Sequence, residues 1–183
     1  MRFFAFAVAG AVALASTAAM AHGPVRLKLE LEKTVNASPD DVWAAIGKFE
    51  DMSWHPAVAS TEIIGDGSVD QPEKSQRVLH LKAESGDPTI TEILSKWQPE
   101  KHCYAYRIEK VDPAVLPVTN YGATLCVKDA GGKANIVWKG GFYRGDPNGQ
   151  PPANMNDDAA IAGVTAIYEA GLNALVEKFG AAP

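Results

Sequence analysis

The sequence lacks the features that mark nucleic-acid-binding proteins and several large enzyme classes. Lys and Arg together number 17 against 22 Asp and Glu, for a net charge of −5, and no basic run occurs anywhere. This balance argues against nucleic acid or an anionic membrane surface as a partner. The sequence also has no Gly-x-Ser-x-Gly motif, no Walker loop and no dinucleotide-binding glycine motif. We therefore expect no catalytic residues of these classes and no cofactor.

Long apolar runs are also scarce, and the clearest one lies at the N-terminus. Arg2 precedes a stretch, 3–14, that contains only apolar residues and Gly, and Ala19-Met20-Ala21 offers small residues for cleavage. This pattern predicts a secretory signal peptide over 1–21 and a periplasmic protein. The run is short for a membrane span, although an uncleaved anchor is the alternative. A single domain over 22–183 is expected to follow.

The rest of the chain has the pattern of a strand, a short helix, six strands and a long helix. Alternating apolar and charged residues predict a strand over 25–35, and Ser38-Pro39 then begins a helix that weakens at Gly47. Apolar positions at helical spacing predict a final helix over about 155–179, capped by Asn154 or Asn156. Breaks rich in Gly and Pro delimit the six strands, which are expected near 57–65, 76–83, 89–97, 102–110, 119–128 and 134–142.

The short connections predict that these strands are antiparallel neighbours. The expected fold class is therefore α+β: a curved antiparallel sheet of about seven strands wrapped around a long C-terminal helix, with short helices after the first strand. A curved sheet and a straight helix cannot pack together along their whole length, so a ligand cavity is expected between them. Gly163 and Gly171 in the helix allow either close packing on the sheet or space for a ligand.

Strand alternation suggests which side chains face this cavity. Tyr104 and Tyr106 share the apolar face of one strand, and Tyr121 lies on the apolar face of the next. Glu92 lies between Ile90 and Leu94 on one face of its strand. A carboxylate in this position is either a pocket group or a residue at a strand edge that faces water.

Cysteine is rare, and its two positions predict a disulfide. If 102–110 and 119–128 form a hairpin about their midpoint, Tyr106 opposes Ala123 and Cys103 opposes Cys126. Both cysteines then lie on the face away from the tyrosines. A cross-strand disulfide is the expected result in an oxidising compartment, whereas a one-residue change of register would separate the sulfur atoms.

Seven short strings occur in a distinctive order and spacing over about residues 26–179. They are Ser38-Pro39-Asp40-Asp41-Val42-Trp43, Trp54-His55-Pro56-Ala57-Val58, Ile63-Ile64-Gly65-Asp66-Gly67, Lys74-Ser75-Gln76-Arg77, Ile90-Thr91-Glu92-Ile93-Leu94, Tyr104-Ala105-Tyr106-Arg107-Ile108 and Thr119-Asn120-Tyr121. Together they resemble the START-like (SRPBCC) superfamily of helix-grip proteins, which includes polyketide cyclases, relatives of the birch-pollen allergen and plant abscisic-acid receptors. The resemblance implies a helix-grip fold around an apolar pocket.

Within the superfamily the chain resembles the MxaD group, small periplasmic proteins associated with methanol oxidation in methylotrophic bacteria. His22-Gly23-Pro24, the segment 54–58 and the export signal carry this likeness. It implies a non-enzymatic accessory role with methanol dehydrogenase and its cytochrome c acceptor as partners. Two alternatives stay open, because a fold does not determine a function. One is a periplasmic carrier of a small hydrophobic ligand or lipid, and the other is a polyketide cyclase-like enzyme using pocket Glu and Tyr residues.

The superfamily resemblance places Glu92 and Tyr121 in the cavity. His55 is either a structural histidine bonded to backbone at a turn or a polar group at the pocket mouth. The segment Ala57-Val58-Ala59 lacks the lysine with which the abscisic-acid receptors hold a carboxylate, so an acidic ligand bound in that manner is not expected. The expected pocket residues are Trp54, His55, Glu92, Tyr104, Tyr106, Tyr121, Trp138, Val164 and Tyr168.

No cluster of residues has the spacing of a metal site. The single candidate is His22, whose free amine and imidazole would chelate Cu(II) after cleavage behind Ala21. The alternative is a frayed terminus without bound metal.

Overall fold

In the part of the chain that the structure describes, seven strands and two α-helices follow one another in the predicted order. A computed structural model describes residues 23–65 and 67–182, so the predicted signal peptide over 1–21 and His22 lie outside the described residues. Each observed strand begins and ends within three residues of its predicted bounds. The elements are β1 (Leu27–Val35), α1 (Pro39–Ile46), β2 (Val58–Ile64), β3 (Gln76–Leu81), β4 (Thr89–Gln98), β5 (Cys103–Val111), β6 (Val118–Asp129), β7 (Ala134–Arg144) and α2 (Asp157–Phe179), with short 3-10 turns at Pro99–Lys101 and Ala153–Met155.

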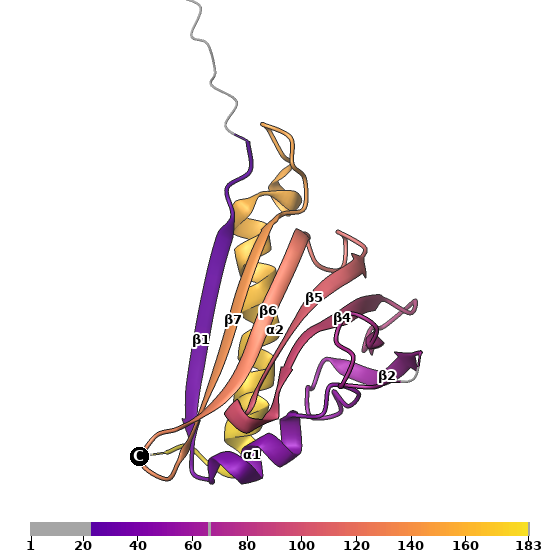
Figure 1. The fold of residues 1–183 in the computed structure, drawn as a ribbon. Coiled ribbons are helices and arrows are strands. Elements are labelled where there is room, and N and C mark those ends of the chain that lie inside the picture. The colour runs from indigo at the N-terminus through magenta and orange to yellow at the C-terminus, as the bar shows by residue number, and fades with distance from the viewer. Residues whose placement is uncertain (1–22, 66, 183) are drawn as a thin grey trace, which may run out of the picture.

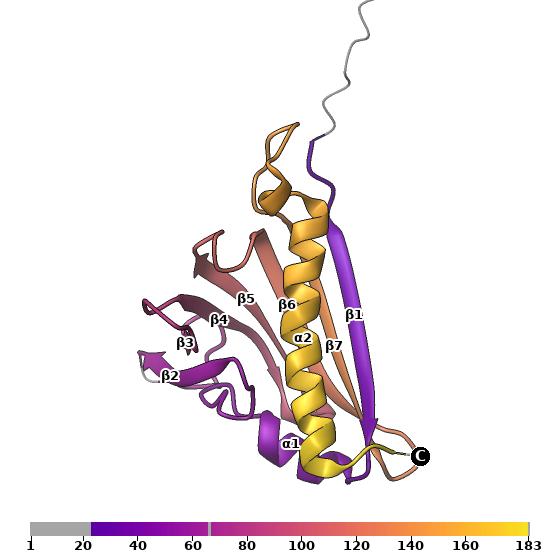
Figure 2. The same ribbon diagram turned by 180° about the vertical axis from the view of Figure 1, so that it is seen from behind.

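All strands form one antiparallel sheet in the order β1-β7-β6-β5-β4-β3-β2. β1 and β2 therefore lie at opposite edges, and α1 with the linker after it connects the two edges (Figure 1). Seen from behind, α2 lies along one face of the sheet, and α1 lies near its C-terminal end (Figure 2). This arrangement confirms the predicted α+β fold of a curved sheet around a long C-terminal helix.

Local side-chain chemistry explains where the helices begin. The Ser38 hydroxyl accepts a 3.1 Å hydrogen bond from the Asp41 amide at the start of α1, and Gly47 ends that helix. The Asn156 side chain accepts a 2.9 Å bond from the Ala159 amide at the start of α2. Of the two predicted caps, Asn156 is therefore the one used.

The helix α2 packs on β1 and β7 through one face. By length and composition alone it is apolar enough to cross a membrane, but the core helix of a globular domain passes the same test. Its buried residues meet the sheet, so we read it as a core helix. They are Ala160, Val164, Tyr168, Gly171, Leu172 and Leu175.

Two glycines in α2 permit close packing. A methyl group built on Gly171 would lie 2.7 Å from His55 Cδ2 and 2.9 Å from Trp138 Cζ3. One built on Gly163 would lie 3.1 Å from Leu116 Cδ1. Both glycines therefore bring the helix against neighbouring side chains, which is the first of the two alternatives considered from the sequence.

The hairpin register in β5 and β6 agrees with the prediction. Tyr106 pairs with Ala123, and Cys103 pairs with Cys126 and forms a disulfide with it. The cysteines alternate with the buried Tyr104 and Tyr106, so the disulfide lies on the opposite face of the sheet. The predicted disulfide is confirmed.

Candidate functional site

A small cavity lies between the sheet, α2 and the linker that joins α1 to β2. Its volume is about 70 Å³. Half-buried side chains form its mouth, namely Ala57, Leu81, Ile108 and Ile167. The deeper walls are buried and mostly apolar, and are formed by Met52, His55, Val58, Leu79, Ile90, Glu92, Tyr106, Leu116, Tyr121 and Trp138.

Five of the nine expected pocket residues line this cavity: His55, Glu92, Tyr106, Tyr121 and Trp138. The other four lie in the surrounding core, because the cavity occupies only part of the space that α2 and the sheet enclose.

Tyr104 lies towards α1, with its ring 6.1 Å from Phe49. Tyr168 stacks on Trp138 at 4.4 Å and is outside the cavity wall. Trp54 is half-buried near Trp138, with the ring centroids 5.8 Å apart. Val164 is buried one turn before Ile167, which is the residue that α2 contributes to the wall.

Of the described residues that line the cavity, Glu92 is the only Asp, Glu, Lys or Arg, and its partner is Arg77. These residues face each other across β3 and β4, and are 5% and 1% exposed. Arg77 donates from Nε and Nη2 to Glu92 Oε2 at 2.7 and 2.6 Å. Its Nη1 donates to the Phe49 carbonyl at 2.7 Å, and its guanidinium lies over the Phe49 ring at 4.2 Å. The pair therefore connects the cavity to the linker that follows α1.

Burial and charge act in opposite directions on this pair. Burial lowers the pKa of Arg77, but the Glu92 carboxylate together with Tyr104 and Tyr106 outweighs burial, so the pKa lies above its usual value. Burial raises the pKa of Glu92, and Arg77 opposes that rise. Because a buried guanidinium requires a counter-charge, we assign both groups as ionised at neutral pH.

His55 is tied to backbone through both ring nitrogens. Its Nε2 donates to the Ile167 carbonyl at 2.9 Å, and its Nδ1 accepts from the Ala57 amide at 3.2 Å. Burial lowers its pKa, so the imidazole is neutral at neutral pH. The histidine is thus both a structural residue at a turn and part of the cavity wall.

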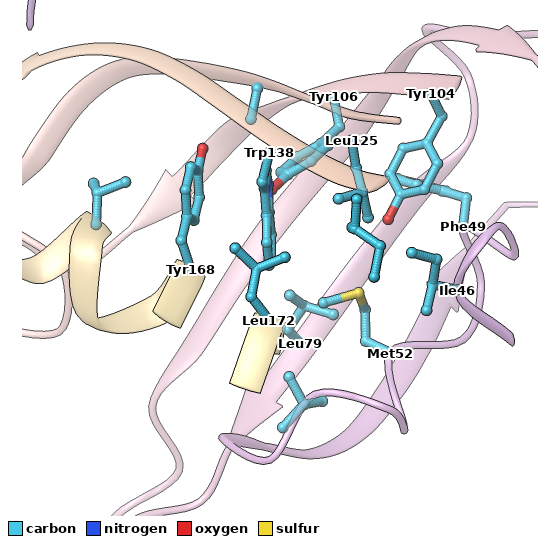
Figure 3. Packing of buried hydrophobic residues seen from close by; sticks show 14 of the residues in the cluster. Ile46, Phe49, Met52, Leu79, Tyr104, Tyr106, Leu125, Trp138, Tyr168 and Leu172 are labelled. Atoms are coloured by element: carbon cyan, nitrogen blue, oxygen red, sulfur yellow. The ribbon is translucent and has the colours of Figure 1, made fainter. Parts of the chain in front are cut away.

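Three tyrosines and a tryptophan form hydrogen bonds in the interior. Trp138 Nε1 donates to the Tyr106 hydroxyl at 3.0 Å, and the hydroxyls of Tyr121 and Tyr168 lie 2.7 Å apart. Figure 3 shows Trp138 beside Tyr168 and Tyr106. Burial raises the pKa of Tyr106, Tyr121 and Tyr168, so these phenols are neutral at neutral pH.

The aromatic side chains also explain the small volume. Trp138 and Tyr168 fill space between α2 and β7, and Gly140 leaves room for the Tyr168 hydroxyl, which a methyl group there would contact directly. Pockets for drug-sized ligands typically enclose about 300–1,000 Å³. A cavity of about 70 Å³ therefore has room for only a small molecule unless its walls move.

Arg77 is the important residue that the pocket prediction omitted. Arg77 shares the inward face of β3 with the buried Leu79, two residues further on. Glu92 shares the inward face of β4 with Ile90 in the same way. Two opposite charges on the inward faces of neighbouring strands were therefore visible in the alternation pattern. The pairing register that puts them face to face was not.

The described part of the chain contains no group of three or more His, Cys, Asp and Glu residues placed to hold a metal ion. His22, the candidate copper ligand, lies outside that part, so its role stays a prediction. The buried acidic group of the cavity is engaged by Arg77.

Comparison with solved structures supports the fold assignment. The chain is similar to XoxI from Bacillus cereus, with 28% identity and a TM-score of 0.65 over 83% of this chain and 94% of that one. It is also similar to the Zhui aromatase/cyclase from Streptomyces sp. R1128, with 20% identity and a TM-score of 0.61 over 84% and 93% of the two chains. Norcoclaurine synthase from Thalictrum flavum, solved with dopamine and hydroxybenzaldehyde, shares 16% identity with a TM-score of 0.59 over 94% of both chains. The last two likenesses show the fold alone.

Sequence comparison identifies the family. No curated protein matches the chain. The family model described as polyketide cyclase / dehydrase and lipid transport matches residues 26–180, which include every strand and both helices. The fold and this match agree: the chain belongs to the polyketide cyclase / dehydrase and lipid transport family.

Proposed function

We propose that this protein binds a small ligand in the cavity and does not transform it. The observation that carries the proposal is an apolar cavity between the sheet, a linker and α2, whose wall includes the buried carboxylate of Glu92. A few polar groups in an otherwise apolar concave site are typical of ligand recognition.

The state of the polar groups favours binding over catalysis. A general base needs a free lone pair and a pKa near the working pH. His55 uses both nitrogens for backbone, and the pKa values of Tyr106 and Tyr121 are raised by burial. Glu92 is held as the counter-ion of Arg77. A cyclase-like reaction at these groups is therefore the weaker candidate.

Xenon binding followed by NMR tests whether the cavity admits a guest, because xenon enters apolar cavities without polar contacts. We expect shifts at the Leu79 and Ile90 methyl groups and at the Trp138 indole, but none at the exposed Ile161. Ala57→Leu, which narrows the mouth, is expected to weaken the response. Shifts confined to surface residues, or none at all, would contradict the proposal.

We propose further that the protein is exported and has an MxaD-like accessory role in methanol oxidation. The signal-like pattern over 1–21 and the segment 54–58 support this, and the disulfide Cys103–Cys126 is compatible with an oxidising compartment. We expect the purified protein to increase electron transfer from methanol dehydrogenase to its cytochrome c acceptor. Ala57→Leu should reduce that effect and Ile161→Ala should not. A coupled rate that is the same with and without the protein argues against this role.

A carrier of lipids is a less suitable alternative, because a cavity of about 70 Å³ does not accommodate an acyl chain. Native mass spectrometry of protein purified from its own source separates the two proposals. A lipid-sized adduct that survives purification would favour the carrier, and its absence agrees with a small, weakly bound ligand.

A further inference from the structure

We infer that the cavity selects a small uncharged molecule that carries a hydroxyl group, and that Glu92 Oε1 accepts the hydrogen bond from that hydroxyl. This inference rests on the proposed binding function and specifies its ligand class. Three features carry it: an unpartnered carboxylate oxygen, the neutrality of the charged pair, and the volume.

The first feature is that only one of the two carboxylate oxygens of Glu92 is bonded to Arg77. Both contacts from Arg77 end on Oε2, at 2.6 and 2.7 Å. Oε1 accepts no hydrogen bond from any described residue. In the described residues, the polar side-chain atoms that are both fully enclosed and without a partner are Trp54 Nε1 and Ser75 Oγ. Oε1 is not one of them, so it keeps some accessible surface. Because Glu92 is 5% exposed and lines the cavity, we infer that the free surface of Oε1 faces the cavity.

The second feature decides the charge of the ligand. Arg77 and Glu92 neutralise each other, and the other polar wall residues, His55, Tyr106 and Tyr121, are uncharged at neutral pH. An ammonium or carboxylate ligand would therefore enter an apolar cavity without a counter-charge of its own, which is strongly unfavourable. A neutral donor satisfies Oε1 without adding charge.

The hydroxyl group also matches a second wall residue. The Tyr106 hydroxyl lines the cavity and accepts from Trp138 Nε1 at 3.0 Å, and the Tyr121 hydroxyl is its second hydrogen-bonding neighbour. Rotation of the Tyr106 hydroxyl directs its proton either to Tyr121 or to a ligand in the cavity. A ligand hydroxyl both donates and accepts, so it complements Glu92 and Tyr106 together. A ketone accepts only, and would leave the carboxylate oxygen unpaired. The volume of about 70 Å³ restricts the apolar part of the ligand to a few carbon atoms.

Four probes of one shape separate these requirements: 2-propanol, acetone, isopropylammonium and acetate. They have the same branched skeleton and the same number of non-hydrogen atoms, and differ in donor capacity and charge. Each is titrated into the full-length protein at neutral pH, and the Trp138 indole and Leu79 methyl signals are followed by NMR. We expect 2-propanol to bind about tenfold more tightly than acetone, as for one hydrogen bond to a charged group. Neither ion should bind in the cavity.

A double variant tests the assignment to Glu92. Glu92→Gln alone leaves Arg77 without its counter-ion and is liable to unfold, whereas Arg77→Met with Glu92→Leu replaces the pair by apolar groups. In this variant 2-propanol and acetone should bind with equal affinity. Glu177→Gln, at an exposed position on α2, is the matched control and should keep the preference for the alcohol.

The outcomes distinguish the inference from the proposed function. Equal binding of alcohol and ketone to the wild type, or tighter binding of either ion, would overturn the inference while xenon entry still supported a binding cavity. If the double variant kept the alcohol preference, Glu92 would not be the acceptor. If xenon and all four probes left the cavity signals unchanged, both proposals would be wrong.

Discussion

At the scale of single residues, the stability of the cavity depends on the contact between Arg77 and Glu92. Oε2 of the carboxylate lies 2.6 Å from Nη2 of the guanidinium, and both side chains are almost fully buried. The two charges have lost their hydration, so each depends on the other. Arg77 also holds the carbonyl of Phe49 at 2.7 Å, which extends this dependence to the linker after α1.

Removing one partner should therefore cost more than removing both. We expect Glu92→Gln to lower the free energy of unfolding by about 3–5 kcal/mol, because it leaves a buried cation uncompensated. The variant carrying Arg77→Met and Glu92→Leu should be close to the wild type or more stable. Urea denaturation measures both, with Glu177→Gln as a control. A double variant less stable than Glu92→Gln alone would show that the pair is not the source of the effect.

His55 should give the protein an acid-sensitive component of stability. Burial lowers its pKa in the folded state below the usual value of about 6.5. At a pH above that value the imidazole is neutral in both the folded and the unfolded state, so the contribution of His55 to the free energy of unfolding is fully present. As the pH falls below it, the unfolded chain takes up the proton first, so the free energy of unfolding decreases towards the folded-state pKa.

The comparison with His55→Gln isolates this component, because the raised pKa values of Glu92 and His80 affect both proteins alike. We expect the difference in unfolding free energy between wild type and variant to shrink as the pH falls below about 6.5. Urea denaturation at a series of pH values measures it. A difference that does not change with pH would contradict a buried neutral His55.

At the scale of elements, Gly171 sets how closely α2 approaches the sheet. Its missing side chain leaves space that His55 and Trp138 fill, and these residues are cavity walls. Gly163, two turns earlier, faces the end of the Leu116 side chain at 3.1 Å, which has more freedom to move.

We expect Gly171→Ala to destabilise the protein by about 1 kcal/mol or more, because overpacking outweighs the gain of about 1 kcal/mol in helix propensity. Gly163→Ala should be neutral or stabilising for the same gain in propensity. Thermal and urea denaturation of the two variants give the comparison. If Gly171→Ala were the more stable of the pair, the proposed packing of α2 on His55 and Trp138 would be wrong.

The disulfide stabilises the hairpin of β5 and β6 independently of the cavity. The cysteines are 23 residues apart in sequence. In the chain-entropy model a closed loop of this length contributes about 3.5 kcal/mol. Cys103→Ala with Cys126→Ala should lose about that amount of stability and keep its affinity for 2-propanol. If the variant also lost its affinity for 2-propanol, the disulfide would be part of the binding site. Its position on the opposite face of the sheet predicts that the affinity stays unchanged.

The sequence allowed the elements to be predicted well, and the cavity wall only in part. Turns rich in Gly and Pro and clear alternation determine where β2 to β7 begin and end, and these are local properties. Tyr104 and Tyr106 share one face of β5, yet only Tyr106 reaches the cavity, because α1 and Phe49 cover Tyr104. Which part of an inward face stays open depends on contacts between distant segments, and alternation does not contain that information.

At the scale of the whole molecule, the fold sets the position of the cavity and the large side chains set its volume. A curved sheet around one helix leaves a gap, as the sequence-based argument predicted. Trp138, Tyr168 and Tyr121 occupy much of that gap, so what remains is about 70 Å³. The cavity volume is the small difference between the volume of the gap and the volume of the side chains that fill it. For that reason it could not be predicted from the sequence.

The central claim is that a small hydroxyl compound occupies this cavity, and its position in a crystal tests it most directly. We predict that crystals of the protein soaked in 2-propanol show the alcohol within hydrogen-bond distance of Glu92 Oε1 and of the Tyr106 hydroxyl. The same soak of the Arg77→Met, Glu92→Leu variant should show it without a fixed orientation. An unchanged cavity in the wild-type crystals, with alcohol bound only on the surface, would contradict the account.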